Sequence, residues 1–495
     1  MSYSPHPHLP YSAFIQACRA FRPSDLVPAI AQVSAEIGEP PYSKYVTHRL
    51  PPWGLAAAAR ESLLHGNEYR SKTVDRAVLL DLMAKYQIAM DIKNADVGTG
   101  DFATKLLTLI AYEQFPYQES TFEELARSHA WLVEGLPYVD TKVIDEAALT
   151  AVLDGVPLRD AIGATFFLQV GALMNGGVYS PSWLDQPNFT EVLKVYPRAN
   201  IETMAARLTT TPRDFKAAFE RHAVGSTSAA RYDYNPLVAT PFVDMGDGVP
   251  VAPASRLILR TVSPGGLYYA GVSRYGNAFA NDLGLLFEHY VGRQLRLIAG
   301  ATVEPEIVFG KGGGEKSVDW FVVLPNLVVL VEVKSRRLGP GARAGGAGLM
   351  SSLRDSLERP RNQLARTVHH ISERHPAFAH VPAGRQMLAL VVTAEPFYTG
   401  SAYLLDRNIA TVPGGALPDV PVAVASARAI EALATHGADA ETILLEEIGK
   451  KNHGGGVVGL QNLSNKDGVD NPILVNAWNS YPWPTRDGVG RPQST

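Results

Sequence analysis

Three residues in the middle of the chain combine types and a spacing that suit phosphodiester chemistry. Asp319 stands at the start of one apolar run, and Glu332 and Lys334 stand near the end of the next. Residues two apart in a strand point to the same face, so Glu332 and Lys334 project together while Val333 faces the other way. A hairpin-like pairing about Pro325–Asn326 brings Asp319 alongside them. The sequence therefore predicts one small site that contains two carboxylates and an ammonium.

Such a site fits the hydrolysis of a phosphodiester, which needs a nucleophilic water and relief of negative charge in the transition state. The carboxylates of Asp319 and Glu332 suit Mg²⁺ or Mn²⁺, because hard cations prefer oxygen ligands and Mg²⁺ keeps several waters. A bound cation lowers the pKa of its water and screens the phosphate. The ammonium of Lys334 can orient the attacking water and stabilise the developing charge.

The elements that position these residues alternate between helix and strand. The pattern predicts a helix over 281–300, strands over 301–310, 318–324 and 327–335, a helix over 351–374 and a strand over 385–397. This order, α-β-β-β-α-β, is typical of a compact α/β domain with a central mixed sheet. The strand at 327–335 is almost purely apolar, as expected for a strand buried on both faces. Charged residues at its end are costly unless they are paired or metal-bound.

The segment VDWFVVLPNLVVLVEVKS (318–335) resembles the core motif of the PD-(D/E)xK nuclease superfamily, which has the restriction-endonuclease-like fold. The resemblance covers roughly residues 275–400. It implies that Asp319, Glu332 and the carbonyl of Val333 bind the metal, and that Lys334 acts on water and transition-state charge. The residue before Asp319 is Val318 rather than proline, a departure that is common in the superfamily.

Two flanking residues extend the resemblance toward the Mrr and RecB branch. Glu288 occupies the helix before the sheet, and Gln363 occupies the helix after the lysine strand, so the implied catalytic set also includes these two side chains. The tyrosine that often follows the glutamine is absent, because Arg366 and Thr367 stand there. An E-x-K tripeptide alone occurs by chance and fits an edge-strand salt bridge, so the joint order of the motifs carries the interpretation. Glu288 as a solvated helix residue and Gln363 as a helix surface residue remain the alternatives.

Basic residues gather beside the predicted site. Residues 334–366 contain eight Lys or Arg and two Asp or Glu, which suits contact with a phosphate backbone. The alternative is a solvated helix and loop. The expected nucleic-acid contacts are Arg336, Arg337, Arg354, Arg361 and Arg366.

The rest of the chain divides by composition and periodicity. Residues 1–231 are expected to form a mostly helical domain, in which Thr121 with Glu124 predicts a capped helix start. Residues 232–270 are expected to be a β-rich connector, with two short strands around a turn at Met245–Gly248. Residues 271–400 form the nuclease-like domain, 401–450 an α/β extension of it, and 451–495 a surface or partly disordered tail.

Composition limits the compartment and the partners. Cys18 is the sole cysteine, which excludes an intramolecular disulfide and a cysteine zinc cluster and fits a reducing cytoplasm. No N-terminal signal peptide is expected, and no run approaches the roughly 18–20 apolar residues of a membrane helix. The formal net charge of -4 leaves nucleic-acid binding open, since only the contacting face must be positive.

The predicted function is that of a magnesium-dependent endonuclease or other nuclease in the cytoplasm, with DNA as the expected substrate. Defence against foreign DNA, such as phage DNA, is a hypothesis that rests only on the resemblance and on the appended helical domain. Two other classes stay open. The nuclease-like domain could bind nucleic acid without cutting it, or the protein could be an assembly subunit whose helical domain forms a homo-oligomer or binds a protein partner.

Overall fold

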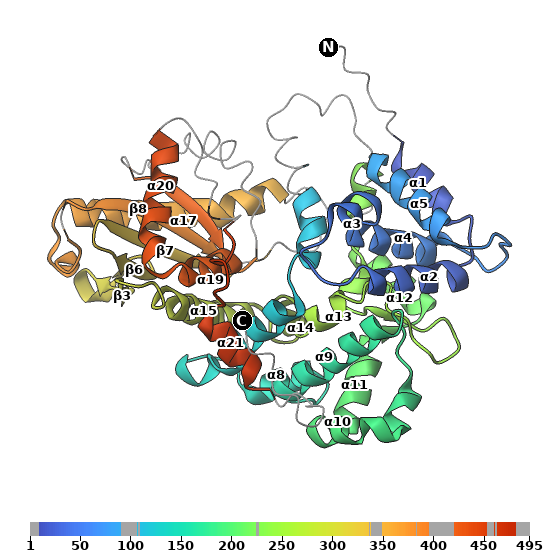
Figure 1. Ribbon diagram of the computed structural model, residues 1–495. Helices are drawn as coiled ribbons and strands as arrows, with labels where there is room; N and C mark the ends of the chain where they lie inside the picture. Colours follow the sequence, from blue (N-terminus) through green and yellow to red (C-terminus); the bar gives the residue numbers. More distant parts are fainter. Residues whose placement is uncertain are drawn as a thin grey trace, which may run out of the picture.

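The computed structural model of the protein describes residues 9–90, 106, 109–223, 227–335, 337, 349–382, 384–395, 420–452, 460 and 463–481. Within these residues the fold is mixed α/β, with helices around a five-stranded sheet (Figure 1). Residues 401–419 of the expected α/β extension and residues 338–348 of the basic segment 334–366 lie outside the described residues.

The sheet has the strand order β3-β6-β7-β8-β9. Its strands are β3 (Thr302–Pro305), β6 (Trp320–Val323), β7 (Leu327–Lys334), β8 (Gln386–Thr393) and β9 (Val422–Ser426). The pairs β3–β6 and β6–β7 are antiparallel, whereas β7–β8 and β8–β9 are parallel, so the sheet is mixed as expected. A parallel pair needs a crossover, and α17 (Leu349–Ser372) supplies it between β7 and β8. A separate small hairpin, β4 (Val308–Phe309) with β5 (Glu315–Lys316), interrupts the strand expected over 301–310.

Helices cover both faces of the sheet. On one face, Val329, Val331 and Val333 of β7 join a core with residues of α15 (Asn277–Leu295) and α19 (Ala427–Thr435). On the other face, Val328 and Leu330 pack with Leu364 and Val368 of α17. The alternation along β7 therefore places Glu332 and Lys334 on the α17 face, as the period of two requires. This almost purely apolar strand is buried on both sides, as predicted.

The first half of the chain is helical (Figure 1). Its longer helices are α1 (Tyr11–Cys18), α2 (Pro23–Glu36), α4 (Pro52–His65), α5 (Arg76–Ile88), α7 (Thr121–Ser128), α9 (Leu158–Met174), α11 (Arg198–Leu208) and α12 (Pro212–His222). Shorter helices are α3 (Lys44–Arg49), α8 (Glu146–Val152) and α10 (Thr190–Val195), and a π-helix, η2 (His129–Val133), follows α7.

The hydrophobic cores do not divide at the boundary expected near residue 231. Helices α1, α2, α4 and α5 form one cluster that also includes Phe215 and Leu237. Residues from Leu125 to Leu208 instead share a continuous core with α15, α19 and one face of the sheet. The second half of the helical region is therefore packed with the α/β part.

Two expectations for the flanking segments were wrong. Segment 232–270 is not mainly β, because it holds the two-residue strand β2 (Phe242–Val243), the helix α13 (Leu257–Arg260) and the start of α14 (Pro264–Tyr275). The expected turn is present, since Val243 bridges Val251 around Gly246 and Gly248, both with positive φ. The tail is also not confined to the surface. After α20 (Ala440–Asn452), residues 463–481 include α21 (Pro472–Asn479), whose apolar side chains are buried in the large core.

Candidate active site

The β6–β7 pairing brings Asp319 to Glu332. Trp320 is paired with Val331, so one further step of the antiparallel register sets Asp319 opposite Glu332. The backbone N–H of Val333 donates to Oδ2 of Asp319 at 2.6 Å, which fixes this carboxylate against the end of β7. The side chain of Trp320 points to the opposite face and is buried in the large core, as its position next to Asp319 predicts.

Glu332 is a buried carboxylate with incomplete hydrogen bonding. Its side chain is 0% exposed, and its Oε1 accepts from the ammonium of Lys334 at 2.5 Å. Its other oxygen, Oε2, is buried and has no hydrogen-bond partner among the residues that the structure describes. Burial, followed by the charge of Asp319, raises the pKa of Glu332 to about 8, although Lys334 partly opposes the shift. A buried acceptor without a donor is costly, and a cation is one means of satisfying it.

Glu288 belongs to the same cluster of charges. It is half-buried on α15, and its backbone carbonyl accepts from Nε1 of Trp320 at 3.1 Å. Burial, then the charges of Asp319 and Glu306, raise the pKa of Glu288 to about 7, with Lys316 and Lys334 acting in the opposite direction. Burial likewise raises the pKa of Asp319, against the effect of Lys334. The carboxylate of Glu288 is therefore close enough to Asp319 for their charges to interact.

Gln363 lies beside the segment that leads into Asp319. Its Nε2 donates to the backbone carbonyl of Ser317 at 2.6 Å. Leu364 and Val368 on the same helix are buried against the sheet, so packing fixes the position of this amide. The contact therefore links Gln363 to the backbone two residues before Asp319.

Two further charged residues, Glu306 and Lys316, lie near the candidate site, and neither is among the residues predicted from the sequence. Glu306 directly follows Pro305, which is paired with Trp320, and its charge helps to raise the pKa values of Asp319 and Glu288. Nζ of Lys316, in β5, lies 2.7 Å from Oε2 of Glu306. Glu306 lies in the strand that the sequence predicts over 301–310. The sequence does not show that this strand pairs with the one that follows Asp319, so Glu306 could not be assigned to the site.

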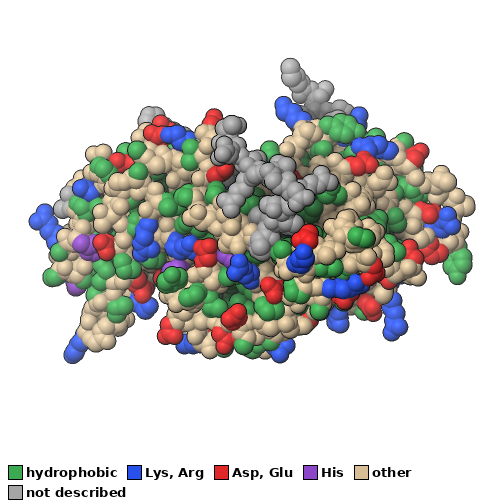
Figure 2. Space-filling model, turned by 60° about the horizontal axis from the view of Figure 1, so that its bottom comes forward, with side chains coloured by type: hydrophobic (Ala, Val, Ile, Leu, Met, Phe, Trp, Pro, Cys, Tyr) green, Lys and Arg blue, Asp and Glu red, His purple; other side chains and the backbone are tan. Residues whose placement is uncertain are grey.

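The five arginines predicted to contact nucleic acid differ in exposure. The prediction for Arg337 was wrong, because its side chain is only 4% exposed and pairs with Glu395, which follows β8. This arginine therefore does not face solvent. Arg366 is exposed on α17. Arg336 and the side chains of Arg354 and Arg361 lie outside the described residues. On the face shown in Figure 2, basic and acidic side chains of the described residues are interspersed.

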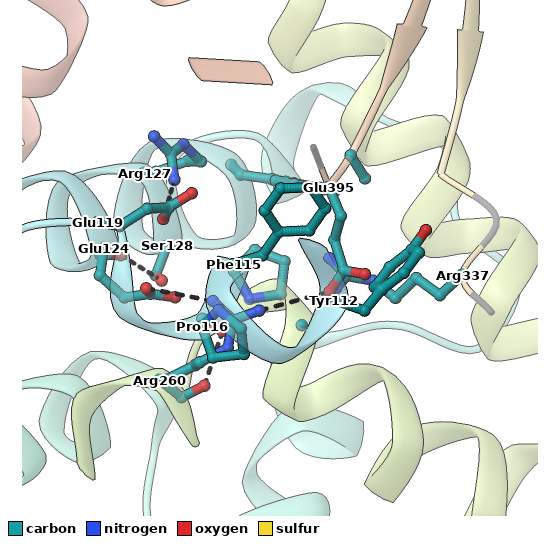
Figure 3. A pocket seen from close by; sticks show the side chains of 15 residues that line it. Tyr112, Phe115, Pro116, Glu119, Glu124, Arg127, Ser128, Arg260, Arg337 and Glu395 are labelled. Atoms are coloured by element: carbon teal, nitrogen blue, oxygen red, sulfur yellow. Dashed lines mark hydrogen bonds and ion pairs between the residues drawn. The ribbon is translucent and has the colours of Figure 1, made fainter. Parts of the chain in front are cut away.

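A second polar site lies at the carboxyl ends of β7 and β8, where a narrow recess of about 30 Å³, partly open to solvent, lies between the strand ends and the helices. Figure 3 shows Arg127 directed at Glu119, and Arg260 placed near Glu124 and Glu395. Three arginines and three carboxylates line this recess, namely Arg127, Arg260, Arg337, Glu119, Glu124 and Glu395. The charges are balanced, so the recess is an ionic junction between the helices and the strand ends.

The resemblance implies that Asp319 and Glu332 bind Mg²⁺ or Mn²⁺. Within the described residues, no three or more His, Cys, Asp or Glu side chains form a group already arranged to hold a metal ion. Asp319 and Glu332 nevertheless lie side by side at adjacent strand ends, and Glu332 has an unsatisfied buried oxygen. Two carboxylates suit Mg²⁺, which commonly takes one or two protein carboxylates and completes its shell with water.

Comparison of the chain with protein-family models, with curated proteins and with solved structures gives no match. Among the helices that the structure describes, none is long and apolar enough to cross a membrane.

Proposed function

We propose that the protein is a metal-dependent nuclease that hydrolyses phosphodiester bonds of DNA, with its active site at Asp319, Glu332 and Lys334. The observation that carries the proposal is the buried Glu332, whose Oε1 is bound by Lys334 and whose Oε2 has no hydrogen-bond partner within the described part of the chain. An ordinary salt bridge does not need a fully buried carboxylate with one oxygen unsatisfied. A cation site explains this arrangement, because a bound ion would take the place of the missing hydrogen-bond donor to Oε2.

Asp319 and Glu332 hold the cation in this proposal, and Val333 offers a backbone carbonyl at the same strand end. A bound Mg²⁺ or Mn²⁺ supplies a water of lowered pKa and screens the charge of the phosphate. Lys334, with its side chain 31% exposed, reaches from the buried Glu332 toward solvent, where its ammonium can contact a phosphate oxygen and orient the attacking water. Glu288, whose pKa is about 7, can accept a proton from that water near neutral pH.

The order of elements supports a restriction-endonuclease-like arrangement for residues 277–393. A helix precedes three antiparallel strands, and a crossover helix leads to a parallel fourth strand. Gln363 and Glu288 both lie beside the Asp319 strand end, as that arrangement requires. DNA as substrate, and a role in restricting foreign DNA, rest on the fold analogy and are part of the proposal.

Cleavage of supercoiled plasmid, linear duplex and single-stranded DNA in Mg²⁺ or Mn²⁺ tests the proposal. The wild type should cut, whereas Asp319→Asn and Lys334→Ala should lose at least about a hundredfold in rate while keeping their circular dichroism spectra. A matched control is Lys466→Ala, which alters an exposed lysine paired with Asp439. Metal-independent cutting, or equal rates in all variants, would reject this site. DNA binding without cutting by the wild type would favour a non-cleaving binding module.

A further inference from the structure

An exposed aromatic ring lies on one side of α15. It belongs to Tyr138, which ends the 3-10 helix η3 (Leu136–Tyr138) and is 76% exposed. The ring stacks on that of His289 in α15, with the two ring centroids 5.7 Å apart and the two planes inclined by 14°. Tyr138 is therefore an oriented ring that is largely open to solvent.

The chain that leads into η3 fixes the lower ring of this stack. Nδ1 of His289 is buried and has no hydrogen-bond partner in the described part of the chain. A Cβ added to Gly135 would lie 3.7 Å from this nitrogen, so the backbone before η3 covers it. Burial, then the charges of Arg293 and Arg296, lower the pKa of His289, so its imidazole is neutral at physiological pH. The two rings therefore form an uncharged stack.

The same two arginines place positive charge beside the stack. Arg293 lies 2.6 Å from a carboxylate oxygen of Glu134, which offsets its charge. Arg296 is exposed, and its guanidinium carbon lies 4.7 Å from the centre of the Trp320 ring. An exposed ring next to an exposed guanidinium suits a nucleotide, because the base can stack and the phosphate can pair with the cation. Tyr138, His289 and Arg296 are together called the aromatic platform.

One helix joins the aromatic platform to the candidate active site. Glu288, whose charge interacts with that of Asp319, directly precedes His289. Consecutive residues are about 100° apart around a helix, so these two side chains lie on neighbouring faces of α15. Trp320, which follows Asp319, donates to the carbonyl of Glu288 and carries the guanidinium of Arg296 on its ring. A strand bound at the candidate active site therefore lies close to the platform.

We propose that the aromatic platform binds an unpaired base of single-stranded DNA next to the scissile phosphate, with the base stacked on Tyr138 and a backbone phosphate bound by Arg296. The inference rests on the proposed nuclease function and assigns to it a substrate that has unpaired bases. A base inside a duplex is already stacked on both faces and must be extruded before it can reach such a ring. Stacking on an aromatic side chain tolerates every base, so the platform selects for single strands rather than for a sequence.

The test measures Kd by fluorescence anisotropy of a labelled single strand in EDTA, where metal-dependent cutting cannot proceed. Tyr138→Ala should raise the Kd of the full chain for this strand by about five- to hundredfold, the usual effect of losing one base-stacking ring. Tyr138→Phe keeps the ring, so its Kd should stay close to that of wild type. The matched control is Tyr69→Ala, because Tyr69 is 96% exposed between α4 and α5 and should not affect binding.

Two further measurements separate the base from the phosphate. A labelled strand that lacks bases carries the same charge, so wild type and Tyr138→Ala should bind it equally. Arg296→Ala should weaken the binding of both strands and lower the salt dependence of log Kd by roughly 0.7, the value for one phosphate contact on a single strand.

The outcomes distinguish the platform from the nuclease site. Equal Kd values of wild type and Tyr138→Ala for the base-bearing strand would overturn the platform and leave the nuclease proposal intact. A loss in Tyr138→Ala that is equally large for the strand without bases, or that Tyr138→Phe does not restore, would overturn stacking as well. A wild type that neither binds nor cuts DNA would reject both proposals.

Discussion

The protonation of Glu332 links the candidate site to the stability of the protein. Its pKa is about 8 in the folded chain, against an ordinary value of 4.5, because the side chain is buried beside Asp319. The folded state therefore holds the Glu332 proton more tightly than the unfolded state. This contribution to stability is fully present below about pH 4.5 and is lost as the pH rises through about 8. The raised pKa of Glu288 acts in the same direction.

Glu332→Gln should remove much of this pH dependence when no divalent cation is present. The amide stays neutral, so the variant should gain roughly 2–4 kcal/mol in free energy of unfolding relative to wild type between pH 5 and pH 9. Urea titrations in EDTA at the two pH values measure the difference. Glu304→Gln, an exposed change, should differ from wild type equally at both. A Glu332→Gln curve parallel to that of wild type would show that Glu332 is already ionised at neutral pH.

At the scale of single residues, much of the candidate site could be predicted from the sequence. Side chains alternate between the two faces of a strand, so residues two apart share a face. That rule joins Glu332 to Lys334, and the short turn then brings Asp319 alongside. Glu306 could not be found in the same way, since its place depends on the pairing of β3 with β6. The burial of Arg337 could not be predicted either, because its partner Glu395 is 58 residues away in the chain.

At the scale of elements, the contact between α15 and β6 positions Asp319 and Glu288 together. The ring of Trp320 rests against Gly292 so closely that an added Cβ would lie 2.2 Å from its Cζ2 atom. Glycine is therefore needed at this point of the helix, despite its poor helix propensity. The indole Nε1 also donates to the carbonyl of Glu288, so helix and strand are joined by packing and by a hydrogen bond.

Gly292→Ala should destabilise the protein by about 1–3 kcal/mol, because overpacking against Trp320 exceeds the gain in helix propensity. The same substitution at Gly284, on the same helix, is the matched control. There an added Cβ would meet Oγ of Ser335 at 2.9 Å, and a hydroxyl can rotate away. Gly284→Ala should therefore be neutral or slightly stabilising in urea titrations. Equal effects of the two changes would contradict the packing argument.

The existence of most elements followed from apolar periodicity, but their ends and their partners did not. The helix expected to begin with a Thr121–Glu124 capping box instead has Ser120 as its N-cap and Glu123 as the reciprocal acceptor. Ser120 with Glu123 and Thr121 with Glu124 both fit the capping-box pattern, and only the backbone geometry shows which residue is the N-cap. The buried helix near the end of the chain was missed because glycine, asparagine and proline around it suggested a loop.

At the scale of the whole molecule, a buried ion pair joins the helical region to the sheet region. Arg127 on α7 contacts Glu431 on α19 through two hydrogen bonds of 2.6 and 2.7 Å. Glu431 also accepts from the hydroxyl of Tyr290 at 2.7 Å. The arginine side chain is 7% exposed and the glutamate side chain 3%, so neither charge has access to water as a substitute. Arg127 also lines the recess at the carboxyl ends of β7 and β8. A shift of this side chain would therefore alter the ion pairs of the recess as well.

Glu431→Ala should cost about 3–5 kcal/mol, because it removes a buried carboxylate that pairs with the guanidinium of Arg127. Asp439→Ala breaks the exposed pair with Lys466 and should cost less than about 1 kcal/mol. Scanning calorimetry of the two variants gives the comparison. A single transition that moves to lower temperature would show that both regions unfold together. Two separate transitions in the wild type would show that they are independent.

Helix α21 has a consequence for the way the protein is made. Its side chains Leu474 and Ala477, with Tyr481 beyond it, complete a core that begins at Leu125, and Tyr481 hydrogen-bonds His129 at 3.0 Å. A chain emerging from the ribosome can pair β6 with β7 before α21 is made, because α21 begins 138 residues after Lys334, the last residue of β7 (472 − 334 = 138). The part of the apolar surface of α7 that packs against α21 stays uncovered until α21 is made. A product that stops before residue 463 would therefore expose this surface to chaperones and proteases.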